Sequence, residues 1–159
     1  MNHIINDPAD RTGYLLWQTA HLVSREITTA LIDWDLTPAQ FGALVHITRE
    51  PGLSSADVSR RINLTPQAVQ TALRPLLDRG LLERRPHPVH RRILGIFPTE
   101  YGWQLTQTAS KAVAAADATM LDTFSPTESE QLRHLLRRAL LSLNPTALDR
   151  SSLRSPDGH

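Results

Sequence analysis

The spacing of apolar residues divides most of the chain into helices. From Arg11 to Trp34, apolar residues recur in alternating steps of four and three, which places them along one narrow side of a helix. The same spacing returns between Thr99 and about Thr123, and again after residues 125–127. Long helices with an apolar side are therefore expected at both ends of the chain. Their apolar positions are Leu16, Ala20, Val23, Ile27, Ala30 and Trp34; Leu105, Ala109, Ala112, Ala116 and Met120; and Leu132, Leu135, Leu136, Ala139 and Leu143.

Three shorter helices are expected in the middle of the chain, where turn residues separate the apolar stretches. Pro38 suits the first turn of one helix, which Pro51-Gly52 closes, and a short helix follows over 54–62. Thr65 is a suitable N-cap for the third, which should end at Gly80 because glycine favours the position after a helix. The middle of the chain is thus predicted to be three helices joined by tight turns.

The pattern changes after Gly80 to two short runs of apolar or β-branched residues, 81–85 and 92–97. The segment 86–91 joins them and contains prolines, histidines and an arginine. This arrangement predicts a two-stranded hairpin with a basic tip, which needs the helices for its stability. From Pro145 onward the serine, proline, aspartate and glycine content predicts a flexible tail over 145–159.

Helix, tight turn, helix and basic hairpin follow one another in the order of a winged helix-turn-helix, whose second helix enters the DNA major groove. Glutamine can pair with an adenine edge, and threonine or alanine can contact a thymine methyl group. Alternatively, these side chains are only solvated surface. The positions expected to face DNA are Thr65, Gln67, Ala68, Gln70, Thr71 and Arg74. Those expected to face the core are Val69, Ala72, Leu73, Leu76 and Leu77.

The net charge of +1 hides an uneven distribution of charge. Residues 54–93 hold eight arginines against three acidic residues, whereas the segments on either side are slightly acidic. Arginine forms bidentate contacts to phosphate and guanine, so this block predicts a polyanion partner, with double-stranded DNA favoured. An arginine-rich coding bias is the alternative for the residue type, since Lys111 is the only lysine, but it does not explain the clustering.

The hairpin supplies the second group of candidate DNA contacts, to the minor groove or its phosphates. These candidates are Arg84, His87, His90, Arg91 and Arg92. In the competing interpretation, Arg84 and its neighbour Arg85 pair with surface carboxylates of Glu83 or Asp78.

Composition excludes several other classes of protein. A chain of 159 residues and 17.8 kDa is one domain or one subunit, and the absence of cysteine excludes disulfide, thiolate-metal and thiol-redox chemistry. No apolar run approaches the roughly 20 residues of a membrane span, and no secretory signal is evident, so a cytoplasmic protein is expected. Nucleotide-binding and hydrolase motifs are missing, so neither an enzyme nor a cofactor is predicted. His87 and His90 lack nearby carboxylates, which argues against a metal site.

Five segments carry a resemblance through their order and spacing. They are Leu36-Thr37-Pro38-Ala39-Gln40-Phe41, Leu53-Ser54-Ser55-Ala56-Asp57-Val58, Leu76-Leu77-Asp78-Arg79-Gly80-Leu81-Leu82-Glu83-Arg84, His87-Pro88-Val89-His90-Arg91-Arg92 and Pro98-Thr99-Glu100-Tyr101-Gly102. The chain resembles the MarR family of winged helix-turn-helix transcriptional regulators over nearly its whole length. The resemblance implies a mainly α fold with a small two-stranded β wing. Residues 37–98 would form the DNA-binding region, while 1–36 and 99–144 would form a helical dimerisation region.

The apolar sides of the terminal helices fit this implication, because they call for a partner helix beyond those of one chain. A homodimer reading a pseudo-palindromic site is therefore favoured over packing within a single subunit. Two positions depart from the family pattern. His90 stands where the family usually has an aspartate that orients the wing arginine, here Arg92. Pro75 lies inside the second helix of the motif, where a kink or a restart is expected.

The resemblance also implies a ligand pocket where the dimerisation helices meet the winged region. Trp17, His21 and His46 are the candidates, and an aromatic ring with two neutral imidazoles would suit a small aromatic or anionic effector. The alternative is that these three residues belong to the ordinary core. The resulting hypothesis is a ligand-responsive regulator, a repressor by family habit. A winged-helix module that binds an acidic protein or RNA is the alternative function.

Overall fold

The computed structural model describes residues 7–86, 94–145 and 147, and these residues form six α-helices and one two-stranded sheet. The elements are α1 (Thr12–Ala30), α2 (Pro38–Arg49), α3 (Ser55–Ile62), α4 (Pro66–Asp78), β1 (Leu82–Pro86), β2 (Leu94–Pro98), α5 (Glu100–Met120) and α6 (Pro126–Leu143), with one-turn 3-10 helices at Pro8–Asp10 and Ile32–Trp34. The predicted order of elements and the predicted fold class are confirmed.

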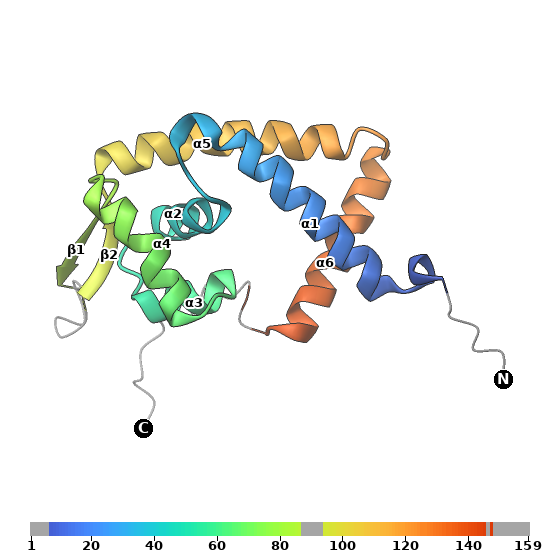
Figure 1. Ribbon diagram of the computed structural model, residues 1–159, viewed down its shortest axis with the longest axis horizontal. Helices are drawn as coiled ribbons and strands as arrows, with labels where there is room; N and C mark the ends of the chain where they lie inside the picture. Colours follow the sequence, from blue (N-terminus) through green and yellow to red (C-terminus); the bar gives the residue numbers. More distant parts are fainter. Residues whose placement is uncertain (1–6, 87–93, 146, 148–159) are drawn as a thin grey trace, which may run out of the picture.

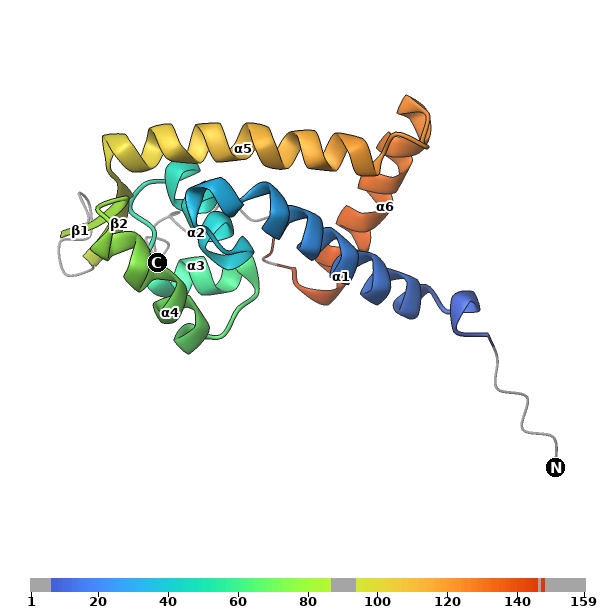
Figure 2. The ribbon, with the colours of Figure 1, turned by 45° about the horizontal axis from the view of Figure 1, so that its top comes forward.

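Helix α5 runs along one side of the molecule, from the hairpin to the start of α6 (Figure 1). Residues 37–98, from here the winged unit, lie beside the first half of α5. The N-terminal part of α1 lies toward the other end, and α6 runs back from the end of α5 toward α3, as a second view also shows (Figure 2). The end of α6 approaches the winged unit, since the Asn144 side-chain amide donates to the Arg60 carbonyl oxygen at 3.5 Å, and the division into two regions stays a prediction.

Local sequence sets where the helices begin. Thr37, Ser54 and Ser125 each accept a hydrogen bond from the backbone three residues ahead, and the side chain of that third residue bonds back to the cap. Such capping boxes satisfy amide groups that have no partner inside the helix. Thr65 and Thr99 cap α4 and α5 through their hydroxyl oxygens alone. Every long helix after α1 thus starts at a hydroxyl residue.

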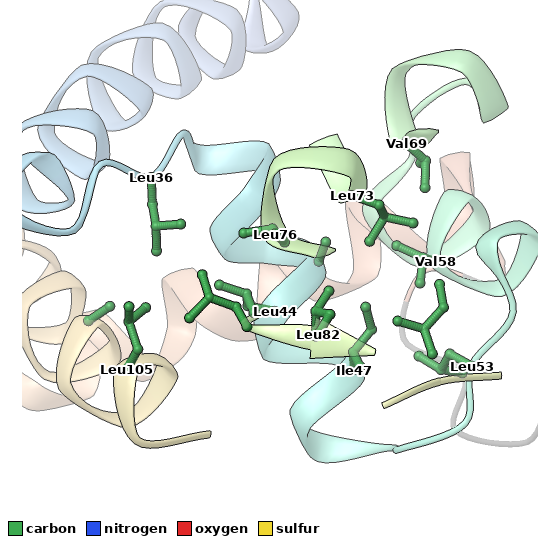
Figure 3. Packing of buried hydrophobic residues seen from close by; sticks show 14 of the residues in the cluster. Leu36, Leu44, Ile47, Leu53, Val58, Val69, Leu73, Leu76, Leu82 and Leu105 are labelled. Carbon is green, nitrogen blue, oxygen red and sulfur yellow. The ribbon is translucent and has the colours of Figure 1, made fainter. Parts of the chain in front are cut away.

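A single apolar core holds the winged unit together. Leu44 and Ile47 of α2 are fully buried against Leu73 and Leu76 of α4, with residues from α3, α5 and the hairpin around them (Figure 3). Burial of each such side chain contributes about 1.5–3 kcal/mol. The core extends only as far as Leu105 and Ala109 on α5. The orientation of α4 is set by its buried residues, Leu73 and Leu76, which pack in this core.

The hairpin is antiparallel and attaches to the loop after α2. Arg84 pairs with Ile96 and Arg85 with Gly95, and Ile96 also bridges Leu53. A Cβ at Gly95 would lie 2.8 Å from the Gly52 carbonyl oxygen, so the close approach of β2 to the loop after α2 requires glycine. The strands run one or two residues later than predicted, and residues 87–93 lie outside the described part of the chain.

Two boundaries differ from the sequence predictions. The predicted restart at Pro75 is wrong, because α4 is one helix from Pro66 to Asp78. Fully buried Leu73 and Leu76 flank Pro75, and their packing outweighs the missing backbone donor. The first helix ends at Ala30 rather than Trp34, and a separate 3-10 turn, Ile32–Trp34, follows it and ends at Asp35 in a left-handed conformation with φ 51°.

Candidate nucleic-acid interface

Helix α4 presents one apolar and one polar side, as predicted. Val69, Leu73 and Leu76 are fully buried and Ala72 nearly so, while Leu77 and Ala68 are half-buried. The exposed residues on the other side are Thr65, Gln67, Gln70, Thr71 and Arg74. The polar side chains are therefore available to a partner along the whole of the helix.

The two threonine hydroxyls on this side already serve the helix itself. Thr65 accepts a hydrogen bond from the Ala68 amide at 3.2 Å, and Thr71 donates to the Gln67 carbonyl at 3.0 Å. The hydroxyl of Thr71 is thus engaged in the helix. Gln67, Gln70 and Arg74 carry the more adaptable polar groups.

Gln70 is joined to the wing by a hydrogen bond. Arg84 of β1 donates from Nη2 to Gln70 Oε1 over 3.1 Å. In a strand, alternate residues share a side, so Arg84 leaves the sheet on the same side as buried Leu82, toward α4. The described residues contain no ion pair between Arg84 and Glu83 or Asp78, so the competing prediction is wrong for Arg84.

Most of the other described arginines of the basic block have structural partners. Arg79 donates to the carbonyl oxygens of Trp34 and Asp35, both at 2.8 Å, and so closes the turn before α2. Arg61 pairs with Glu50 at 2.8 Å, and its side chain is only 8% exposed.

Arg60 pairs with Asp57, and Arg85 pairs with Glu83 at 3.1 Å while its guanidinium lies 4.2 Å from the centre of the Phe97 ring. The prediction for Arg85 as a surface pair is thus confirmed. Arg61 and Arg79 serve the fold, while Arg60 and Arg85 form pairs in which the arginine is exposed, and Arg74 and Arg84 lie exposed on or beside α4. The candidates His87, His90, Arg91 and Arg92 lie outside the described residues.

Helix α3, which precedes α4, is stabilised by its own carboxylate. Asp57 accepts hydrogen bonds from the Ser54 backbone and hydroxyl at 3.0 and 2.5 Å. Burial opposes the charge, but the bonds from Ser54 and the Arg60 guanidinium hold the pKa of Asp57 below its usual value. Asp57 therefore fixes the start of α3, whereas the turn into α4 is held by the Ser59 hydroxyl, which donates to the Leu64 carbonyl oxygen at 2.6 Å.

Two of the three ligand candidates lie together on α1. The rings of Trp17 and His21 stack with centroids 6.3 Å apart, and Tyr14 follows 6.0 Å from Trp17. Trp17 is 63% exposed, so it is not a core residue of this chain. His21 also borders a shallow hollow of about 300 Å³ with Arg25, Thr28 and other polar residues. Arg25 was not among the residues predicted from the sequence, although its position one helical turn after His21 places it on the same side of α1.

His46 has different surroundings. It lies half-buried on α2, and burial, together with the charges of Arg61 and Arg49, lowers the pKa of its imidazole. No ring contact or hydrogen bond among the described residues joins His46 to Trp17 or His21. The structure thus brings together two of the three predicted ligand residues, Trp17 and His21. His46 lies instead near Arg61 and Arg49.

The described part of the chain contains no group of three or more histidine or acidic residues that could hold a metal ion. Over the same residues, no helix combines the length and apolar character needed to cross a membrane.

Comparisons with known proteins agree with this arrangement. The MarR family model matches residues 34–93, which include α2, α3, α4 and β1. The HTH-type transcriptional repressor Rv2887 of Mycobacterium tuberculosis is 33% identical over 126 residues, which cover 79% of this chain and 91% of that protein. The crystal structure of Rv2887 in complex with DNA has a TM-score of 0.69 at 32% identity and is matched over 81% of this chain and 97% of its own.

A second solved structure extends the likeness in fold. CouR from Rhodococcus jostii RHA1, bound to p-coumaroyl-CoA, has a TM-score of 0.77 at 24% identity, with 91% of this chain and 99% of that chain covered. Proteins of this kind are DNA-binding regulators rather than enzymes, in agreement with the absence of catalytic motifs in the sequence. On the strength of the match to nearly the full length of Rv2887, the chain belongs to the MarR family of winged helix-turn-helix transcriptional regulators.

Proposed function

We propose that this protein is a homodimeric repressor that binds a pseudo-palindromic DNA site through α4 and leaves it when a small aromatic acid binds. The observation that carries the proposal is the exposed polar side of α4, with Gln67, Gln70 and Arg74 held above a fully packed apolar side. Glutamine and arginine are the side chains that read purine edges in the major groove. The rigid packing beneath them favours sequence-specific contacts.

The similarity to Rv2887 supports this proposal, because that repressor has been crystallised with DNA. The exposed leucines of α6 support the homodimer. Leu135, Leu136 and Leu140 are each at least 40% exposed, and a second copy offers the same apolar surface. Two winged units related by a two-fold axis would read two half-sites.

The ligand part of the proposal rests on α1 and on the same relative. Rv2887 has also been crystallised with salicylic acid, at 32% identity to this chain and a TM-score of 0.69. The hollow beside His21 contains Arg25, whose guanidinium suits a carboxylate, and the ring of Trp17 stacks on His21. In an aromatic acid, the carboxylate would pair with Arg25, and the ring would lie near the stacked rings of Trp17 and His21.

The experiment is a selection of random duplex DNA by the purified protein at about 150 mM salt, followed by sequencing. The expected result is a palindrome whose half-site centres lie roughly one helical turn apart. Gln70→Ala should then relax the base preference at one position of each half-site. Enrichment of no sequence, with binding that vanishes as salt rises, would overturn the proposal and favour the interaction module for RNA or an acidic protein.

Release by ligand is measured on the selected duplex. Salicylate should lower the fraction of DNA bound, and Arg25→Ala should raise the concentration needed. Arg11→Ala, which removes the same charge near the start of the same helix, serves as the matched control. Equal responses of the two variants would contradict the assignment of Arg25 to the ligand.

A further inference from the structure

Arg84 and Gln70 belong to different elements, yet their side chains meet on the exposed side of the winged unit. The strand places Arg84 beside α4, because the adjacent inward residue on that side of β1, Leu82, is buried in the core. Its Nη2 lies 3.1 Å from Gln70 Oε1. Arg85, the next residue, is turned to the opposite side of the strand and is held by Glu83 and Phe97. Only one of the two neighbouring arginines therefore reaches α4.

The chemistry of this contact fixes the orientation of the glutamine amide. A guanidinium has donors and no acceptor, so the amide atom that faces Arg84 has to be the oxygen. The amide nitrogen of Gln70 must then point elsewhere, and the oxygen keeps a second lone pair. A glutamine held in this way offers one donor and one acceptor in a fixed order, which is the pair that the N7 and N6 positions of adenine require.

We propose that Arg84 is a positioning residue that sets the base preference of Gln70, in addition to any contact that it makes with phosphate. Without Arg84 the amide can rotate and donate to guanine or thymine acceptors, so its selectivity falls. With Arg84 the amide is oriented before DNA arrives, and less side-chain freedom is lost on binding. This inference rests on the proposed function, since it assumes that α4 reads a DNA sequence.

The test uses the duplex enriched by the wild-type protein, together with duplexes that vary the base at the position whose preference Gln70→Ala relaxes in part. Dissociation constants give the ratio between the worst and the best base. Arg84→Ala should lower this ratio about tenfold when Gln70 is present, the effect expected for a lost hydrogen bond to a charged group. In the Gln70→Ala background the same change should leave the ratio as it is.

Two results would overturn the proposal. If Arg84→Ala weakens all duplexes equally and leaves the ratio unchanged, Arg84 contacts only phosphate. If the ratio falls further in the Gln70→Ala background, Arg84 reads the base itself. Arg85→Ala removes the same charge from the other side of β1 and should leave the ratio unchanged. Arg84→Lys keeps a donating cation and should restore part of the ratio.

A measurement without DNA keeps the inference separate from the proposed function. In the free protein, the side-chain amide resonances of Gln70 should shift in Arg84→Ala, while those of Gln67 should stay in place. An unchanged Gln70 resonance would contradict the contact and with it the inference. A wild-type protein that selects no sequence would refute the proposed function, whereas a selective protein with an unchanged ratio in Arg84→Ala refutes only the role of Arg84.

Discussion

The winged unit and α6 differ in how much of their apolar surface is buried by their own chain. Leu44, Leu73 and Ile96 of the winged unit are buried almost completely by their own chain. Leu136 and Leu140 of α6 are as apolar but remain about two-fifths exposed, and Ser129 is the one residue of α6 that is buried. The described part of α1 resembles α6, since it contains no buried residue.

This difference indicates that a single chain buries the apolar residues of the winged unit but leaves those of α6 exposed. A helix with exposed leucines gains little from its own subunit, and contiguous apolar surface of this kind marks an interface. The winged unit, by contrast, has a continuous core and needs no second chain to hold α4 in place. Substitutions in the two regions should therefore affect different properties: association for α6 and unfolding for the winged unit.

The largest effect is expected from Leu136→Glu, which places a charge on the predicted apolar side of α6. The variant should be monomeric in sedimentation velocity, and its affinity for a two-half-site duplex should fall about 100- to 10,000-fold because the two units no longer bind together. Leu141→Glu is the matched control. It lies about 140° around the helix from Leu136, has similar exposure, and should remain dimeric. Dimers of both variants would show that α6 is not the interface.

The next effect belongs to the winged unit. Leu73→Ala leaves a cavity at a fully buried position of α4 and should lower the free energy of unfolding by about 2–5 kcal/mol. Urea denaturation measures this loss, at one fixed protein concentration because association contributes to stability. Gln67→Ala, on the exposed side of the same helix, should change it little. Similar losses in the two variants would mean that α4 is not anchored by its apolar side.

The order of elements could be predicted from the sequence because helix starts are local. Thr37, Ser54, Thr65, Thr99 and Ser125 each cap the helix that follows within a few residues. The two sides of α4 could be predicted for the same reason, since the period of a helix is enough to separate them. The restart expected at Pro75 was wrong because Leu73 and Leu76 pack against residues distant in the chain, and this packing outweighs the low preference of proline for a helix interior.

The roles of Arg79 and Arg84 could not be predicted, because each depends on residues brought near by the fold, whereas the local pair of Arg85 with Glu83 could be predicted. Arg79 closes a turn near Asp35, and Arg84 reaches Gln70 from another element. A count of charges along the chain gives no information about such partners. Of the six described arginines in the basic block, Arg61 and Arg79 serve the fold, so clustering overstated the basic surface open to DNA.

A smaller effect compares two ion pairs of equal length, one in each region. Arg61–Glu50 and Arg133–Glu130 both measure 2.8 Å, but the first is largely buried and the second is exposed on α6. Glu50→Gln should cost about 1–3 kcal/mol of unfolding free energy because it removes the negative charge from a largely buried ion pair. Glu130→Gln should cause no measurable change, since solvent screens exposed pairs. Thermal unfolding of both variants beside the wild type tests this contrast.

The smallest effect is a dependence of stability on pH that originates in the winged unit. Burial, with Arg61 and Arg49 nearby, lowers the pKa of His46 in the folded protein from 6.5. As the pH falls below 6.5, the unfolded chain takes up a proton at this residue more readily than the folded chain, so folding becomes less favourable. Unfolding by urea at pH 7.5, 6.5 and 5.5 should show this decline in the wild type and a shallower one in His46→Gln. His134→Gln removes a histidine from exposed α6 and should keep the wild-type decline. If His134→Gln flattened the curve and His46→Gln did not, the proton-sensitive part of the molecule would be α6, and the contrast between the two regions would be reversed for this property.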